Sequence, residues 1–308
     1  MFPTTNVITE RAFGNGLKTY FVGFDLDNDG NRAYEWERLV DALASKIPEF
    51  AFGHHMGTST DNNLIVDKIR KAAKAIYRIP EFEAVREIYT KGGSIKDDDT
   101  ANNYLRRGEF GELILHLLLT NHNNTIPLLA KIYFKDSNNE TVHGFDAVHI
   151  QPSTKTLWLG ESKLYFDGRK GVDALISDIK AHFERDYLTE EFTLILKKIH
   201  PYENIPEKET WIKLLNGSKQ LLEVLQNVNI PLLCTYTSDN FSKYDDTAIR
   251  SFINDYDREV IGLKEYFDKR SNHPWKTNLN IILLLFPVKC KKELVSRLHN
   301  RLYHMQRV

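Results

Sequence analysis

Three ionisable side chains, Asp146, Glu161 and Lys163, lie within apolar segments that the sequence predicts to be strands. These segments are residues 142–150 and 156–165, and the Q-P-S-T stretch between them ends the first because proline cannot donate to a strand ladder. Side chains alternate along a strand, so Glu161 and Lys163 share one face, while Asp146 shares a face with apolar residues of the first strand. Buried charges are costly unless something compensates them, so the three residues are candidates for one site.

A divalent cation is the compensation that these residue types favour most. Mg²⁺ takes hard oxygen ligands, such as two carboxylates, a backbone carbonyl and waters. A lysine beside such an ion can point at the attacking water or at a phosphate. No G-x-x-x-x-G-K-[ST], H-E-x-x-H or G-x-S-x-G motif occurs, so the sequence indicates no competing catalytic centre.

This arrangement resembles the PD-(D/E)xK nuclease superfamily, with Asp146 as the first acid, Glu161 as the second and Lys163 as the lysine. The E-x-K tripeptide ends an apolar strand and follows the aspartate by 15 residues. The resemblance implies an α/β fold with a restriction-endonuclease-like core, in which a central mixed sheet is flanked by helices. The core order would be a helix, three strands, a helix and a later strand. The sequence predicts these elements at residues 105–120, 126–134, 142–150, 156–165 and 172–187, with the later strand at 230–237, at 279–288 or at both.

The first of these helices carries a further candidate. Phe110, Leu113, Ile114 and Leu117 form its main apolar face, and Glu109, Glu112 and His116 fall on one polar stripe. The stripe could be a solvated surface, but leucines flank it on both sides, which favours buried acids. The resemblance implies a glutamate from this helix in the metal cluster, and Gly111-Glu112 fits that pattern better than Glu109 does.

A second D-x-K sequence, Asp178-Ile179-Lys180, is not expected to form a site. Val172, Leu175 and Ile176 recur with helical spacing around it, so the segment is predicted to be a helix. Residues two apart on a helix point in nearly opposite directions and cannot converge on one metal.

Composition excludes several classes of protein. The formal net charge is −1, so the chain has no general attraction to nucleic acid. Cys234 and Cys290 lie far apart in apolar runs, which argues against a disulfide scaffold or a zinc site and favours buried free thiols. The longest apolar run, residues 281–288, is too short to span a bilayer. We therefore expect a cytoplasmic protein without membrane contact.

A glycine-rich and then acidic stretch at residues 91–101 is the best candidate for an internal boundary. We expect an α/β N-terminal region at residues 1–95, suited to docking a partner, and a nuclease domain at residues 96–308. The last helix, which follows residue 289, is rich in lysine and arginine. Its basic residues could form a solvated face or a surface that tracks phosphates or docks a partner.

Three motifs narrow the resemblance. R-R-G-E-F-G-E-L-I-L-H at residues 106–116, G-F-D-A-V-H at 144–149 and L-G-E-S-K at 159–163 resemble the HamA family, the nuclease subunits of the bacterial Hachiman anti-phage system. The resemblance implies DNA as the substrate and a HamB-like helicase subunit as the partner, in a heterodimer. The charge agrees with this, because a helicase that delivers unwound DNA removes the need for strong DNA affinity in the nuclease.

The sequence therefore predicts a Mg²⁺-dependent deoxyribonuclease that accepts Mn²⁺ as a substitute. We expect Asp146 and Glu161 to bind the metal, Glu112 to complete its ligands and the carbonyl of Ser162 to be a further ligand. Lys163 would orient the water and stabilise the charge of the phosphate. Two alternatives remain open: a catalytically silent scaffold that binds nucleic acid, and a stand-alone restriction or repair endonuclease.

Overall fold

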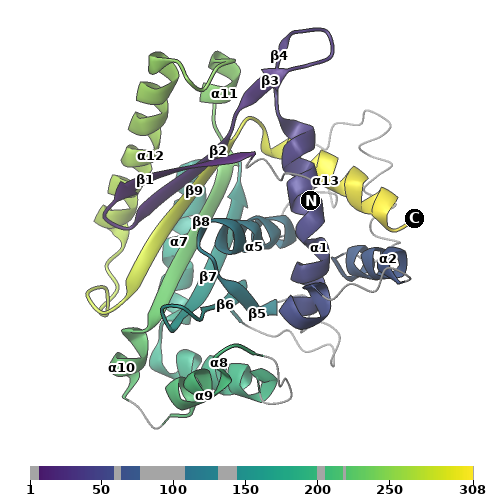
Figure 1. Ribbon diagram of the computed structural model, residues 1–308. Helices are drawn as coiled ribbons and strands as arrows, with labels where there is room; N and C mark the ends of the chain where they lie inside the picture. Colours follow the sequence, from purple (N-terminus) through teal and green to yellow (C-terminus); the bar gives the residue numbers. More distant parts are fainter. Residues whose placement is uncertain are drawn as a thin grey trace, which may run out of the picture.

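The computed structural model describes residues 7–58, 64–76, 108–130, 144–199, 205–217 and 220–307. Within these residues a mixed seven-stranded sheet forms the centre of an α/β fold, in the order β1-β2-β9-β8-β7-β6-β5 (Figure 1). The strands are β1 Ile8–Gly14, β2 Leu17–Val22, β5 Ile126–Ala130, β6 Ala147–Gln151, β7 Thr156–Tyr165, β8 Val228–Thr237 and β9 Asn280–Val288. A separate hairpin pairs β3 Phe24–Leu26 with β4 Arg32–Tyr34.

The middle of the sheet is parallel and its two sides are antiparallel. β2, β9, β8 and β7 run in one direction, whereas β1 and the β6–β5 pair run against their neighbours. β8 and β9 read as nearly continuous apolar runs, as expected of parallel strands that are covered on both faces. Helices supply that cover (Figure 1).

The described helices are α1 Trp36–Thr58, α2 Ile65–Ile76, α5 Glu109–His122, α7 Gly168–His182, α8 Arg185–Ile199, α9 Lys208–Leu215, α10 Leu221–Leu225, α11 Asn240–Lys243, α12 Arg250–Arg270 and α13 Lys291–Met305. α5 packs on β7 and lies against α1, and α1 in turn contacts α13. α7 packs on β7 and β8 and is itself covered by α12. None of the helices that the structure describes combines the length and the apolar composition needed to cross a bilayer.

The order α5-β5-β6-β7-α7, followed after α8, α9 and α10 by β8, confirms the predicted sequence of helix, three strands, helix and later strand. Both expected later strands are present, as β8 and β9. β1 and β2, near the N-terminus, form one edge of the main sheet. The predicted boundary at residues 95 and 96 lies outside the described residues. β2 pairs with β9 in parallel, with Leu17 opposite Leu283, so this N-terminal strand belongs to the main sheet.

The helix expected at residues 172–187 is two helices, because α7 ends at His182 and α8 begins at Arg185. α7 also begins earlier than predicted. The carboxylate of Asp167 accepts hydrogen bonds from the backbone N–H groups of Arg169 and Lys170, at 2.7 and 3.2 Å, and so caps the first turn. Both cysteines are free, as predicted, although Cys290 is only partly buried.

A glycine sets the close approach of α7 to the sheet. A Cβ added at Gly171 would overlap Cys234 Sγ on β8. We expect Gly171→Ala to lower the free energy of unfolding by about 1–3 kcal/mol, because a tightly packed helix must move to admit the methyl group. Gly262 in α12 is the matched control, since a Cβ there meets nothing within 4 Å. Gly262→Ala should raise stability by up to about 1 kcal/mol. Urea unfolding measures both, and equal effects would contradict the packing argument.

Candidate functional site

β7 presents two faces to two different helices. Gly160 and Ser162 face α5, since a Cβ at Gly160 would come within 2.9 Å of Leu115 Cδ2. Glu161 and Lys163 point the other way, toward α7, where each finds a polar partner. The alternation predicted for this strand is therefore confirmed, and its bounds match the expected residues 156–165.

Asp146 lies immediately before β6 and ends the β6–β7 ladder. The last paired residues are Ala147 and Gly160. Just beyond them, the backbone N–H and the hydroxyl of Ser162 both donate to Asp146 Oδ2, at 2.9 Å each. The contact fixes the Asp146 carboxylate at the end of the ladder next to Glu161, as the strand register predicts. Asp146 is 6% exposed and Glu161 is 2% exposed, so the two form a buried acidic pair.

α7 supplies partners for both charged residues on its side of β7. His182 Nδ1 lies 2.7 Å from Glu161 Oε1, and Lys163 Nζ lies 2.6 Å from Asp178 Oδ2. Asp178 and His182 are four residues apart, so they share one face of the helix. The side chains of Lys163 and His182 remain about a quarter exposed, at 26% and 25%. Solvent can therefore reach the two basic groups beside the buried acids.

The electrostatics of the site follow from burial and from crowding of carboxylates. Burial and the neighbouring Asp146 raise the pKa of Glu161 to about 7, although His182 partly opposes the shift. Burial opposes the charged form of Lys163, but its hydrogen bond to Asp178 and the nearby acids outweigh this and raise its pKa. Burial likewise disfavours protonated His182, and Glu161 more than compensates, so its pKa is raised. Lys163 therefore carries its positive charge at neutral pH.

Residues after β5 and β7 complete the surroundings. Glu191 of α8 lies beside Gly144, where an added Cβ would be 3.3 Å from its Oε2. Burial raises the pKa of Glu191 to about 7, and His182 opposes the shift. The ring of Tyr187 stacks on His182 with centroids 4.7 Å apart, and Phe145 meets His182 edge-on at 6.1 Å. An aromatic wall thus borders the acidic pair.

The structure does not bring every predicted ligand together. Glu112 is buried at 6% exposure on α5, the helix that covers the Ser162 face of β7. Within the described ranges, no group of three or more His, Cys, Asp or Glu side chains has the arrangement needed to hold a metal ion. Glu109 is also buried, at 7% exposure, so burial does not distinguish the two glutamates. The ligand roles of Glu112 and of the Ser162 carbonyl stay predictions, and the contact that the structure gives Ser162 is to Asp146.

Asp178, His182 and Glu191 were missed by the sequence reasoning. Asp178 was set aside with its D-x-K sequence, and that part was wrong: the segment is helical and Lys180 is exposed, yet Asp178 pairs with Lys163. The available signal was the spacing of Asp178 and His182, which places two polar groups one turn apart beside the apolar face of the helix. Nothing in local periodicity indicated that this face covers Glu161.

Two of the predicted ligands, Asp146 and Glu161, are suited to hold Mg²⁺. Mg²⁺ retains several waters and is usually held by one or two carboxylates together with substrate phosphates. Asp146 and Glu161 offer two carboxylates whose mutual repulsion shows in the raised pKa of Glu161. A cation between them would relieve that repulsion, so these two residues are suited to hold the ion.

A second cluster of buried polar side chains lies on the α5 side of the sheet, opposite the side of Glu161 and Lys163. His116 of α5 and His149 of β6 approach through Nδ1 and Nε2 at 3.3 Å, and His149 Nδ1 is 2.8 Å from the hydroxyl of Thr125. His116 Nε2 lies 3.5 Å from Glu49 Oε2 of α1. Burial lowers the pKa of His116 and holds that of His149 well below its ordinary value. The contacts from Glu49 through His116 to His149 therefore join α1, α5 and β6, and both imidazoles are neutral.

These histidines predict a pH dependence of stability. In the unfolded chain these two imidazoles take up protons with a pKa of about 6.5, whereas in the folded protein they stay neutral at that pH. The free energy of unfolding therefore falls as the pH drops below that value. His149→Gln should make this fall shallower between about pH 7.5 and about pH 5. Glu161 and Glu191, with raised pKa values, act in the opposite direction, so the readout is the difference between variant and wild type in urea unfolding. Identical pH profiles would contradict the prediction.

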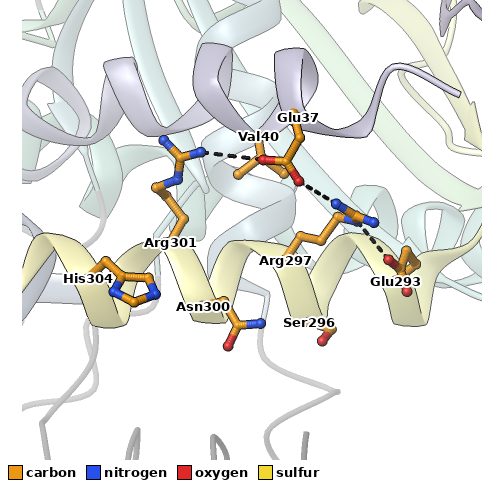
Figure 2. A pocket seen from close by; sticks show the side chains of 8 residues that line it. All are labelled: Glu37, Val40, Glu293, Ser296, Arg297, Asn300, Arg301 and His304. Carbon is orange, nitrogen blue, oxygen red and sulfur yellow. Dashed lines mark hydrogen bonds and ion pairs between the residues drawn. The ribbon is translucent and has the colours of Figure 1, made fainter. Parts of the chain in front are cut away.

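Two arginines of the basic C-terminal helix α13 are paired with acids of α1. Figure 2 shows the carboxylate of Glu37 between Arg297 and Arg301, in a pocket of about 360 Å³. Arg301 also pairs with Asp41 at 2.5 Å, and Arg297 Nε bonds Glu293 at 2.6 Å. These ion pairs favour a solvated, helix-joining role for the two arginines over the tracking of phosphates.

Comparison with known proteins gives the family. No curated protein matches the chain. The model of the HamA family matches residues 4–302 of the 308, which covers the acidic pair, Lys163 and both helices that flank them. The chain therefore belongs to the HamA family, a family of Hachiman anti-phage defence components.

Proposed function

We propose that this protein is a metal-dependent deoxyribonuclease with a PD-(D/E)xK-type core and that it is the effector of a complex with a helicase subunit. One observation carries the proposal. A buried pair of carboxylates, Asp146 and Glu161, and a charged, partly exposed Lys163 lie together at the end of β7. The element order of the core and the family membership support the same conclusion.

Each residue has a distinct part in phosphodiester hydrolysis. Mg²⁺ held by Asp146 and Glu161 would supply Lewis-acid chemistry to the phosphate. Lys163 places a fixed positive charge where negative charge develops on the phosphate, and Asp178 holds its ammonium group in position. His182 holds the carboxylate of Glu161, and Ser162 holds that of Asp146. Glu112 of α5 would be a further acid that serves the site.

The test is a cleavage assay on plasmid and single-stranded DNA. Purified protein, alone and with its helicase partner and ATP, is incubated with Mg²⁺, with Mn²⁺ or with EDTA. We expect cleavage that requires the metal and is stronger with the partner, because a chain of net charge −1 has little affinity of its own for DNA. No cleavage by the protein or the complex with either metal would sink the proposal.

A catalytically silent scaffold is the main alternative, and one observation favours it. Glu161 is already paired with His182 and Asp146 is hydrogen-bonded to Ser162, so neither carboxylate needs a metal ion as a partner. A titration with Mn²⁺ distinguishes the two cases, since a scaffold should bind no ion at this pair. Co-purification tests the third case, a stand-alone restriction or repair enzyme, because no ATPase should co-purify with such an enzyme.

A further inference from the structure

A second pocket lies at the end of α7, outside the acidic pair. It has a volume of about 310 Å³, which is within the range of about 300–1,000 Å³ of small-molecule sites. The junction between α7 and α8 forms one wall, and the connection from α12 to β9 forms the other. The residues on which its chemistry depends are Lys180, Phe183, Glu184, Arg185, His273 and Trp275.

Trp275 is held in place before any ligand arrives. His273, which is 8% exposed, accepts a hydrogen bond at Nδ1 from the backbone N–H of Trp275, at 3.1 Å. The other ring nitrogen of His273 is then the protonated one, and the ring hydrogen-bonds the backbone of Phe183 at the end of α7. The rings of His273 and Trp275 also meet edge-on, with centroids 5.5 Å apart. A half-buried indole fixed in this way offers a face at little cost in conformational entropy.

The charges around the indole suit an anion. Lys180 and Arg185 are exposed, and within the part of the chain that the structure describes neither has an ion-pair partner. Glu184 is the acidic residue that lines the pocket. Burial lowers the pKa of His273, so this imidazole is neutral at pH 7. Two cations against one carboxylate leave the lining net positive, in a chain whose total charge is −1.

The pocket adjoins the candidate site through one residue. Phe183 follows His182, the partner of Glu161, and packs on Phe145 with ring centroids 5.4 Å apart. Lys180 is two residues from both Asp178 and His182 and so points to the other side of α7, and a strand bound at Lys163 would pass around the end of this helix to reach the pocket. An aromatic face with flanking cations is the combination by which proteins hold unpaired nucleotides, because every base has a face that stacks.

We propose that this pocket binds an unpaired nucleotide of single-stranded DNA. Trp275 stacks on the base, and Lys180 and Arg185 contact the adjoining phosphates. This inference rests on the proposed nuclease function and adds to it a substrate class, a single strand, since bases in a duplex are already stacked on one another. The preference also suits a partner that unwinds DNA.

The experiment measures binding apart from cleavage. A labelled single-stranded oligodeoxynucleotide is titrated with the full chain in EDTA at low salt, and fluorescence anisotropy gives the dissociation constant. Trp275→Ala should weaken binding by about fivefold or more, and Trp275→Phe should retain most of it. The double variant K180A/R185A should weaken binding and reduce its salt dependence. Lys170→Ala is the matched control, because Lys170 is exposed at the opposite end of α7.

The outcomes separate this inference from the proposed function. Trp275-dependent binding without cleavage would support the pocket and contradict the nuclease proposal. Metal-dependent cleavage together with unchanged binding by Trp275→Ala would overturn the pocket and leave the nuclease intact. The pocket proposal would also be overturned if the wild type did not bind the oligonucleotide, or if Lys170→Ala lost as much affinity as the pocket variants. Trp275→Leu, which keeps apolar volume without a stacking face, replaces the alanine variant if urea unfolding shows that variant to be unstable.

Discussion

Lys163→Ala is expected to reduce DNA cleavage by about 10²- to 10³-fold while the protein remains folded. The substitution removes the charge that faces the developing negative charge on the phosphate. The side chain of Asp178, which loses its partner, is 20% exposed and can be hydrated, so the cost in stability should be small. The measurement is the initial rate of plasmid cleavage with Mg²⁺, the helicase partner and ATP, together with circular dichroism.

Two further variants sharpen this result. Lys163→Arg keeps the charge but changes its geometry, so we expect partial activity at best. Lys170→Ala removes an exposed lysine from the same helix that supplies Asp178, and it should cleave at the wild-type rate. Cleavage retained by Lys163→Ala, with or without the helicase, would refute the role of this lysine.

Glu161→Gln is expected to reduce cleavage by at least about 10²-fold and to weaken Mn²⁺ binding. Glutamine has nearly the same shape, and its amide can keep a hydrogen bond to His182, so the packing of β7 on α7 should be preserved. The change therefore removes a metal ligand with little other effect. Cleavage rates and calorimetric titration with Mn²⁺ measure the two consequences.

The control for this variant is Glu209→Gln, which alters an exposed glutamate of α9. It should change neither cleavage nor metal binding. Wild-type Mn²⁺ affinity in Glu161→Gln would show that the acidic pair is not the metal site. Cleavage lost with metal affinity unchanged would instead assign Glu161 a part in positioning rather than in metal binding.

Much of the candidate site could be predicted because it depends on local patterns. Alternation along β7 places Glu161 and Lys163 on one face whatever the rest of the chain does. The turn after residue 150 and the short loop it forms bring Asp146 back beside Glu161, since a hairpin register follows from its turn. Short-range geometry of this kind is encoded in a few adjacent residues.

What could not be predicted depends on packing between distant segments. The 3.6-residue period shows that Asp178 and His182 share a helix face, but not which strand that face covers. The helix divides at residues 183 and 184, and Glu191 of α8 lies beside Gly144, a contact that no local pattern predicts. The ion pairs of Arg297 and Arg301 with α1 join residues about 260 positions apart, and composition alone does not reveal them.

The sequence by itself determined the strands β5 to β9, the helix periods and the placing of an acid and a lysine on one face of β7. Only the tertiary structure decided that Lys163 binds Asp178, that His182 holds Glu161, that α5 packs on the Gly160 and Ser162 face of β7 and that β2 joins the sheet beside β9. The physical reason is that periodicity specifies which side of an element is buried. Which element covers that side is set by the packing of the whole core.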